Sequence, residues 1–196
     1  MSQKFFDLSV SKVNRETPSS VSISFDIPAE LQQDFVYKNG QYITIKHQVN
    51  GEEIRRSYSL CSAPQLNEDF TIAVKEVPGG KMSPVLNQVS KGTSLKVSVP
   101  EGNFTMDKAS KLCLFAGGSG ITPILSLLKQ ALSQEIETQL IYANTQPNEI
   151  IFKQEIEDLA KQYPQLLKVT HFVEAEANEV EAAYHGRISS EFLEQI

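Results

Sequence analysis

Three short segments of the chain combine residues that could hold a phosphate or an aromatic ring. The first is Arg56-Ser57-Tyr58-Ser59, at the end of a predicted strand. Its arginine offers a guanidinium to a phosphate, and its tyrosine offers an aromatic face to a planar ring. Taken by itself, the tetrapeptide is more simply an exposed strand end with a buried tyrosine.

The second segment is Gly79-Gly80-Lys81-Met82-Ser83, which follows a predicted strand and opens a predicted helix over residues 83–89. Two glycines let the backbone come close to a ligand, and the amino terminus of a helix presents N–H groups to an anion. A plain capping turn with Ser83 as the cap is the alternative interpretation.

The third segment is Ala116-Gly117-Gly118-Ser119-Gly120-Ile121-Thr122-Pro123. It follows an apolar run and opens a helix, with Pro123 in the first turn, where its missing N–H costs little. A dinucleotide site at the carboxyl edge of a parallel sheet requires this setting. A glycine triplet alone occurs in many unrelated proteins, so it is the strand–turn–helix context that favours a nucleotide.

The first half of the chain, residues 1–107, has the pattern of short strands separated by turns. Each predicted strand carries alternating apolar residues or β-branched residues, and Asn50-Gly51 is a strong hairpin signal. Strands at this spacing favour a closed antiparallel barrel with Greek-key connections. The predicted strands cover residues 5–13, 21–26, 41–47, 55–60, 70–75 and 94–99.

The second half, residues 108–196, alternates strands and helices and predicts a parallel α/β domain. Its first strand, 111–116, is a continuous apolar run of the kind that is buried on both faces of a sheet. A linker over residues 100–110 joins the two predicted domains. The remaining elements are a helix at 121–131, a strand at 138–143, a helix at 150–162 and a strand at 166–173.

Composition and charge argue against several classes of protein. The net charge of −6 over 196 residues argues against a nucleic-acid binder. No segment approaches the roughly 18 apolar residues of a membrane span, and the amino terminus lacks the apolar run of a secretion signal. We therefore expect a cytoplasmic protein.

Cysteine and histidine usage predicts no metal centre. Cys61 and Cys113 are too few for the thiolate cage of an iron–sulfur cluster, and we expect no disulfide between them. His47, His171 and His185 have no ligand spacing. Cys61 follows the first segment directly and could line a bound ring, but a small buried residue is the simpler interpretation.

Together, in this order, the three segments resemble the ferredoxin–NADP(+) reductase-type flavoproteins, in which a flavin barrel precedes a pyridine-nucleotide domain. Residues 142–144, 149–152 and 186–188 are further similar to the reductase components of multicomponent oxygenases, the phenylacetyl-CoA oxygenase reductases among them. The resemblance covers the whole chain. The Pro100–Phe104 segment also resembles the family's barrel-closing segment.

The resemblance implies an FAD site in the barrel. Arg56 would meet the pyrophosphate, Tyr58 would stack on the isoalloxazine ring, and Ser59 would hydrogen-bond near N5. The end of the following strand would contact the polar edge of the ring through its backbone, and the glycine turn would hold the pyrophosphate. The full set of FAD-binding residues is Arg56, Ser57, Tyr58, Ser59, Val74, Lys75, Glu76, Gly80, Lys81, Met82, Ser83 and Thr122.

The same resemblance implies an NAD(P)H site in the second domain. Hydride would pass from nicotinamide to flavin, with Ser59 and Thr122 as the catalytic residues near N5. Electrons would then leave for a one-electron acceptor, such as an iron–sulfur centre on a partner protein or on a domain outside this chain. The nucleotide-binding residues are Gly118, Ser119, Gly120, Thr122, Pro123, Asn144, Thr145 and Arg187.

The charge of the second half favours NADH, or little discrimination. Residues 108–196 contain one arginine, six lysines and twelve acidic residues, so their net charge is 7 − 12 = −5. Thr145 also stands where related proteins commonly carry an arginine for a 2′-phosphate. Lys153 or Arg187 could substitute for that arginine. The run 174–181, with four glutamates, is most simply a solvated segment, with a docking site for a redox partner as the alternative.

Two other functions fit parts of the pattern. One is a flavin-binding regulatory or scaffold subunit without nicotinamide turnover, and the other is a nucleotide-binding α/β protein without flavin. The family continues with a further strand, a Cys-Gly-Pro turn and often an iron–sulfur domain, none of which occurs before Ile196. We therefore expect an incomplete α/β half with exposed apolar surface, and FAD binding that survives better than hydride transfer.

Overall fold

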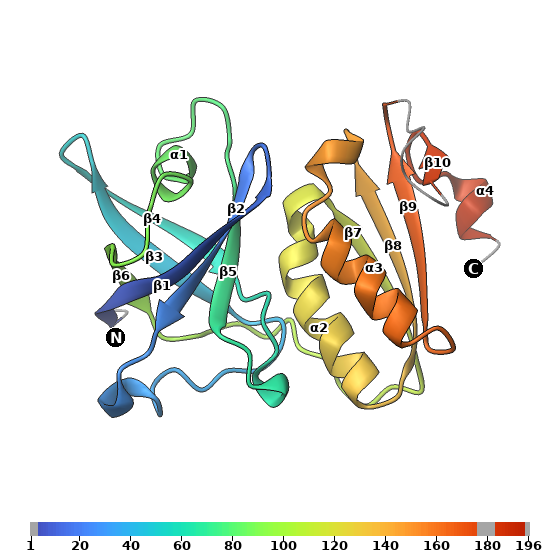
Figure 1. The fold of residues 1–196 in the computed structure, drawn as a ribbon, viewed down its shortest axis with the longest axis horizontal. Helices are drawn as coiled ribbons and strands as arrows, with labels where there is room; N and C mark the ends of the chain where they lie inside the picture. The colour runs from blue at the N-terminus through green and yellow to red at the C-terminus, as the bar shows by residue number, and fades with distance from the viewer. Residues whose placement is uncertain (1–3, 176–182, 195–196) are drawn as a thin grey trace.

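The computed structural model describes residues 4–175 and 183–194, which form two sheets that lie side by side (Figure 1). The first sheet is antiparallel, in the order β4-β3-β6-β1-β2-β5. Strand β6 lies between β1 and β3, so the order is that of a Greek key and not a meander. The strands are β1 Phe5–Thr17, β2 Ser20–Asp26, β3 Tyr42–Val49, β4 Glu52–Ser59, β5 Phe70–Lys75 and β6 Ser94–Ser98.

This sheet closes on itself. Leu60, directly after β4, forms an antiparallel bridge with Ile72 in β5, and Cys61 N donates to Thr71 O over 3.0 Å. Alternate residues of each strand point into the barrel, where they form an apolar core. The predicted antiparallel barrel is confirmed. The short helices of this half are η1 Ala29–Leu31, η2 Pro64–Leu66 and α1 Ser83–Leu86.

Two turns show why the chain needs particular residues. Asn50 and Gly51 both have positive φ, 52° and 80°, which is what a two-residue hairpin between β3 and β4 requires. Gly40 has a φ of +88°, and a Cβ there would lie 1.9 Å from Phe104 O. Phe104 belongs to the predicted barrel-closing segment, Pro100–Phe104. Glu101 of this segment and Tyr42 of β3 exchange two backbone hydrogen bonds of 2.9 Å.

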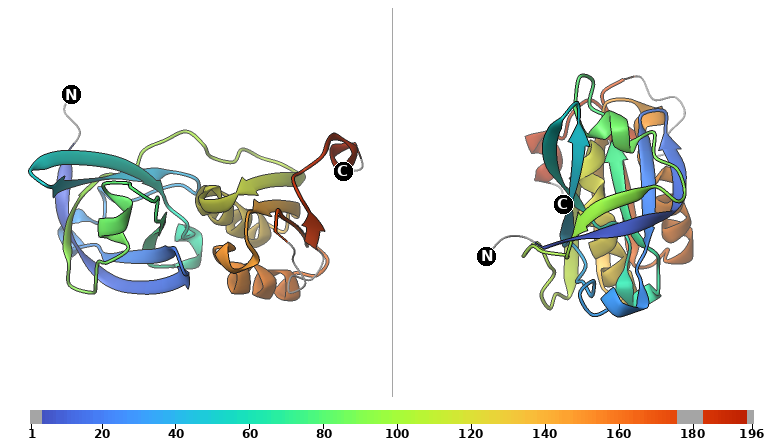
Figure 2. Two further views of the ribbon diagram at one scale, coloured as in Figure 1. Left: turned by 90° about the horizontal axis from the view of Figure 1, so that it is seen from above. Right: turned by 90° about the vertical axis from the view of Figure 1, so that its left-hand side faces the viewer.

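The second sheet is parallel, in the order β10-β9-β8-β7. Helices α2 and α3 cover one face of it, and α2 lies between the sheet and the barrel (Figures 1 and 2). The predicted strand–helix–strand–helix–strand order is confirmed. The elements are β7 Lys111–Gly117, η3 Gly118–Gly120, α2 Ile121–Ser133, β8 Glu137–Asn144, η4 Pro147–Glu149, α3 Lys153–Gln162, β9 Leu167–Val173, β10 Ala183–His185 and α4 Ser190–Leu193.

Three details of this half differ from the sequence prediction. Helix α3 begins at Lys153 and not at residue 150, because Phe152 adopts a left-handed φ of 60° that a helix cannot contain. Strand β10 was not predicted, since it has only three residues. Strand β7 is buried on one face only: Leu114 and Ala116 pack under the helices, but Cys113 is exposed and Phe115 is 44% exposed.

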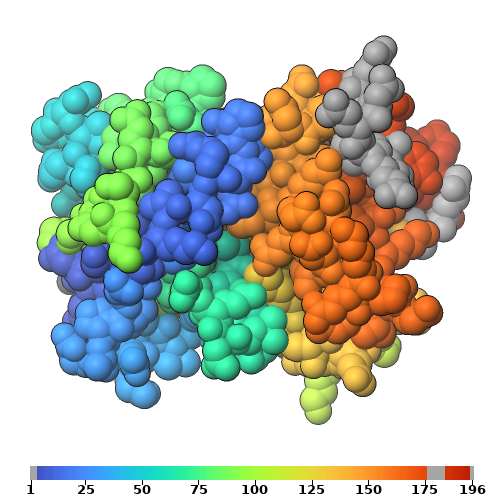
Figure 3. Space-filling view, in the orientation of Figure 1, coloured from blue at the N-terminus to red at the C-terminus, as the bar shows by residue number. Residues whose placement is uncertain are grey.

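The two halves share an apolar contact. Cys61 and Ala73 of the barrel belong to the same buried cluster as the apolar residues of α2 and α3. Cys61 is therefore a small buried residue, as predicted, and both cysteines are free thiols. The space-filling view shows the halves pressed together along a seam (Figure 3). No helix in the described ranges is long and apolar enough to span a membrane.

Candidate functional site

All three sequence segments meet in one cleft between the barrel and the amino-terminal end of α2. Its volume of about 550 Å³ lies within the range of ligand sites, roughly 300–1,000 Å³. The cleft thus joins segments that lie more than 60 residues apart in the chain, from Arg56 to Pro123. Its lining residues are Arg56, Ser57, Tyr58, Ser59, Ala73, Lys75, Val77, Gly80, Lys81, Met82, Ser83, Ser119, Gly120, Thr122 and Pro123.

The cations of the cleft are not equally available to an anion. Lys81 is paired with Glu52, and Lys75 Nζ lies 3.4 Å from Glu149 Oε2. Arg56 has no acidic partner within ion-pair distance in the described part of the chain, and its Nη1 donates only to the carbonyl of Arg55, over 2.7 Å. A guanidinium in this state is suited to bind a phosphate.

The hydroxyl groups lie on both walls of the cleft. Tyr58, on β4, is half-buried, and burial raises its pKa to about 12 although the charge of Arg56 opposes the shift, so the phenol is neutral at ordinary pH. Ser59 lines the same wall. On the opposite wall, Thr122 Oγ1 donates to Ser119 O over 3.1 Å, so this hydroxyl can accept a further hydrogen bond without losing that one.

The glycine turn differs from its predicted form. Helix α1 is a single turn, and Ser83 does not cap it: its Oγ accepts from Val77 N over 3.0 Å. Gly80 N donates to Val77 O over 2.8 Å, so this N–H is not free for a pyrophosphate. A Cβ on Gly80 would lie 2.9 Å from Val77 O, which explains the glycine. Lys81, which is paired with Glu52, and the Ser83 hydroxyl both line the cleft next to this turn.

Two residues of the predicted FAD set lie outside the cleft. Val74 points into the barrel core, and its carbonyl accepts from Asn87 Nδ2 over 3.2 Å. Glu76 N donates to Ser19 O over 2.7 Å. Of the three residues predicted at the end of this strand, Lys75 is the one that lines the cleft.

A second cleft, of about 460 Å³, lies at the carboxyl ends of the parallel strands. Lys75 lines both clefts, and Gly118 of the second cleft is followed directly by Ser119 of the first. Gly118 has a left-handed φ of +47°, and its carbonyl accepts from the Tyr142 hydroxyl over 3.0 Å. The lining residues are Lys75, Gly117, Gly118, Ala143, Asn144, Thr145, Glu174, Gly186, Arg187 and Ile188.

Asn144 is an unusual polar residue of this second cleft. The residue is 7% exposed, and its side chain lies beside the Tyr142 hydroxyl. Burial raises the pKa of that hydroxyl, and Asn144 opposes part of the rise. Neither amide atom makes a hydrogen bond of ordinary geometry within the described residues. Buried polar groups almost always have a partner, so this amide is suited to a ligand.

Glu174 is a site residue that the sequence assigned only to the run 174–181, as part of a solvated segment or a docking site. It follows β9 directly, and its Oε1 accepts from Arg187 Nε over 2.8 Å. Its position directly after a predicted parallel strand could have indicated it, because the carboxyl ends of neighbouring parallel strands meet at one edge of a sheet, where ligands bind. The rest of the predicted glutamate run, residues 176–181, lies outside the described residues. Ala73 and Val77 were also missed, as apolar residues without a distinguishing pattern.

Comparison with known proteins matches both halves. Residues 7–106 match the family described as oxidoreductase FAD-binding domain, and residues 114–196 match the oxidoreductase NAD-binding domain. One subunit of the 1,2-phenylacetyl-CoA epoxidase of Escherichia coli K12 is 35% identical over 98% of this chain and 55% of its own length. The ferredoxin reductase component of 3-ketosteroid-9-alpha-monooxygenase from Rhodococcus rhodochrous is 37% identical over 86% and 49%.

The chain spans about half the length of these two relatives. Among solved structures, the flavohem-like FAD/NAD-binding domain of nitric oxide dioxygenase from Vibrio cholerae has a TM-score of 0.82 and 25% sequence identity. That likeness covers 96% of this chain and 81% of the other. It includes both the barrel and the parallel sheet.

Proposed function

The chain belongs to the oxidoreductase family that joins an FAD-binding domain to an NAD-binding domain, and we propose that it passes electrons from NADH through FAD to a one-electron acceptor. We assign residues 1–107 to the flavin and residues 108–196 to the nucleotide. The observation that carries this proposal is the single cleft to which β4, the glycine turn and the start of α2 all contribute.

The residues on the barrel side of the cleft fit FAD. Arg56 offers an unpaired guanidinium to a phosphate, and Lys81 and the Ser83 hydroxyl add donors from the glycine turn. Tyr58 offers a neutral aromatic ring against which a planar ring system can pack. We assign Ser57, Ser59 and Met82 to the same site because they line the same cleft.

When bound, FAD supplies the chemistry that links a two-electron hydride donor to a one-electron acceptor. The protein's own contribution is to hold and orient the reactants, which can remove a large part of a reaction barrier. Ser59 and Thr122 lie on opposite walls of the cleft, where they can hydrogen-bond to groups between those walls. We propose them as the catalytic residues.

The nucleotide-binding set extends from the first cleft into the second. Ser119, Gly120, Thr122 and Pro123 line the former, and Gly118, Asn144, Thr145 and Arg187 line the latter. In this second cleft, the carboxylate of Glu174 pairs with Arg187. A 2′-phosphate would meet that negative charge and would have to compete for Arg187, whereas a ribose 2′-hydroxyl can donate to a carboxylate. This arrangement supports a preference for NADH.

The acceptor that we propose is an iron–sulfur centre, on a partner protein or on a domain outside this chain, as part of an oxygenase system. The names of the two relatives, one subunit of an epoxidase and the ferredoxin reductase component of a monooxygenase, support this assignment. We place the protein in the cytoplasm, where NADH is supplied.

The test is the visible spectrum of the purified protein, recorded without oxygen before and after addition of each pyridine nucleotide. The proposal expects a flavin spectrum that NADH bleaches. A flavin spectrum that neither nucleotide changes would favour a regulatory or scaffold subunit. A colourless protein that cannot be reconstituted with FAD would favour a nucleotide-binding protein without flavin.

A further inference from the structure

Helix α2 carries three buried polar residues on one face, beyond the glycine turn that precedes it. Thr122, Ser126 and Lys129 follow one another at i, i+4 and i+7, so they lie on one face of the helix. Thr122 lines the cleft. Ser126 and Lys129 are 0% and 6% exposed, although serine and lysine are residues that usually remain in water. Both are polar residues buried where α2 faces the barrel.

Ser126 is hydrogen-bonded to two loops of the barrel. Its Oγ donates to Ser62 O over 2.6 Å. Asn39 Nδ2 donates to Ser126 O over 2.9 Å and lies 3.1 Å from Ser126 Oγ. These three side chains are almost completely buried, so the bonds are made without competition from water. The middle of α2 is therefore held by hydrogen bonds to two separate loops of the barrel.

Lys129 lies one turn further along and joins three elements. Its Nζ lies 2.9 Å from Glu68 Oε2 of the barrel and 2.6 Å from Glu155 Oε1 of α3. Glu68 is itself fixed, since the same oxygen accepts from Ala63 N over 2.8 Å. Burial by itself would lower the pKa of Lys129, but Glu155 and Glu68 outweigh it and raise the pKa, so the ammonium stays charged.

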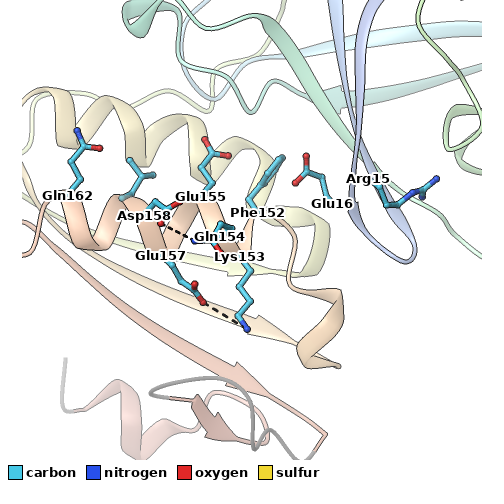
Figure 4. Close-up of a pocket in the computed structure, with 10 residues that line it drawn as sticks. Arg15, Glu16, Phe152, Lys153, Gln154, Glu155, Glu157, Asp158 and Gln162 are labelled. Carbon is cyan, nitrogen blue, oxygen red and sulfur yellow. Dashed lines mark hydrogen bonds and ion pairs between the residues drawn. The ribbon is translucent and has the colours of Figure 1, made fainter.

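The carboxylates around Lys129 are balanced by its positive charge. It lines a cavity of about 220 Å³ together with Glu16, Glu68 and Glu155, and Lys12 and Asp69 also face this cavity. Figure 4 shows Glu16, from β1, pointing toward Phe152 and Glu155 across a neighbouring groove of about 730 Å³. Without the ammonium, the carboxylates on the two sides of the interface would repel one another.

A second polar contact lies at Glu149, in η4. Its Oε2 accepts from the hydroxyl of Ser19, from Thr17 Oγ1 over 3.2 Å, and lies 3.4 Å from Lys75 Nζ. Thr17 and Ser19 are in the β1–β2 turn of the barrel. The parallel half is thus joined to the barrel at two separate places by groups with directional bonds.

We propose that Ser126 and Lys129 are positioning residues that fix α2 against the barrel and so place Thr122 opposite Ser59. Buried ion pairs contribute little net stability compared with apolar contacts, but their geometry is specific. The expected effect on hydride transfer rests on the proposed function. The arrangement of the two halves is independent of the proposed function, and it can be measured in the protein without any nucleotide.

The first test is the distance between the two halves. Cys113 on β7 is exposed and Cys61 is buried, so spin labels can be attached at Cys113 and at an introduced cysteine, Lys91→Cys, in an exposed turn of the barrel. We compare Lys129→Met, which removes the charge, with Lys161→Met on the exposed side of α3. The distance distribution should stay narrow in the control and should broaden or shift in Lys129→Met. An unchanged distribution in Lys129→Met would overturn the proposal.

A third variant separates positioning from a loss of stability. Lys129→Met combined with Glu68→Gln and Glu155→Gln also removes the two carboxylates that pair with Lys129, so it should fold even if Lys129→Met alone does not. Its melting temperature should return to that of the unmodified protein while its distance distribution remains broad. Lys129→Arg, which keeps the charge, should remain narrow. A triple variant with a narrow distribution would show that Lys129 serves stability alone.

The kinetic consequence is measured by stopped-flow reduction of the bound flavin at saturating NADH. A misplacement of about 1 Å can slow a positioned reaction by about 100-fold, so the triple variant should react roughly 10- to 100-fold more slowly. Its FAD affinity should stay within about twofold, because the proposed flavin contacts lie in the barrel. If the unmodified protein is not reduced by NADH, the proposed function fails, and the distance measurement still decides the positioning role.

Discussion

At the scale of single residues, Arg56 is the group on which the proposed flavin site depends most. Charge-assisted hydrogen bonds contribute about 1.5–3 kcal/mol, so Arg56→Ala should weaken FAD binding by one to two orders of magnitude. Arg55→Ala is the matched control, because this neighbouring arginine is paired with Glu53 and does not line the cleft. Flavin fluorescence during titration of the apoprotein measures both. Equal FAD affinities in the two variants would contradict the assignment.

Glu174 provides the residue-scale prediction for coenzyme choice. Glu174→Gln removes the charge beside Arg187, so the ratio of kcat/KM for NADPH to that for NADH should rise by about 5- to 20-fold. Adding Arg187→Gln should abolish the gain, because the freed guanidinium is its cause. Glu137→Gln, at the other end of the sheet, is the control. A ratio unchanged by Glu174→Gln would exclude this carboxylate as the determinant.

The residues that line the two clefts differ in how well the amino-acid sequence could predict them. Arg56, Tyr58, Ser119 and Thr122 were found because each belongs to a local motif, and a motif is a pattern along the chain. Glu174 belongs to no motif, and its role depends on Arg187, which comes from another element. Gly80 was found for its flexibility, but its N–H donates to Val77 O, a detail of turn geometry that residue type does not determine.

At the scale of elements, Gly40 tests how the barrel closes. Gly40 and Gly92 both have a φ of +88°, but only the Cβ at Gly40 would meet an atom, Phe104 O at 1.9 Å. Gly92→Ala should therefore cost about 1–2 kcal/mol, the strain of a left-handed residue. Gly40→Ala should cost clearly more, because Phe104 and its segment must move as well. Urea unfolding of both variants gives the difference, and equal losses of stability would show that the contact is not tight.

The interface between β1 and α3 gives a prediction for pH. Burial raises the pKa of Glu16 above its ordinary value of 4.5, and Glu155 adds to the rise, although a hydrogen bond from Ser22 opposes it. Since the folded-state pKa is the higher one, stability is fully present below pH 4.5 and part of it is lost as the pH rises through the folded-state value.

Glu16→Gln cannot ionise and can still accept from Ser22, so it should be more stable than the unmodified protein at neutral pH. The difference should shrink toward zero below pH 4.5. Thermal unfolding across this range measures it, with Glu30→Gln in the short helix η1, where this side chain is exposed, as the control. A variant that is less stable at neutral pH would mean that the ionised carboxylate is favourable at this interface.

Element boundaries were predictable where apolar periodicity defined them and not where single backbone angles did. Strand β5 has the predicted bounds, because its alternation continues to both ends. Helix α3 starts late because Phe152 is left-handed, which places its ring and Ile151 in the core. Strand β10 depends on pairing with β9 and has too few residues to show a pattern of its own.

At the scale of the whole molecule, the order of the two halves was evident from the change in pattern near residue 107. Their mutual arrangement was not. It depends on contacts such as Ser126 with Ser62 and Lys129 with Glu68, which join residues more than 60 positions apart. Serine and lysine at such positions resemble surface residues in the sequence, and only the folded structure shows that Ser126 and Lys129 are buried.

In the proposed function, one cleft brings nicotinamide and flavin together so that hydride passes directly between them. The most direct measurement is anaerobic stopped-flow bleaching of the bound flavin by NADH that carries deuterium at one or the other of the two C4 positions. A cleft with fixed walls should present one face of the nicotinamide, so one label should slow the bleaching by a primary isotope effect and the other should not. Bleaching that neither label slows, or a flavin that NADH does not bleach, would show that hydride does not pass directly from nicotinamide to flavin in this cleft.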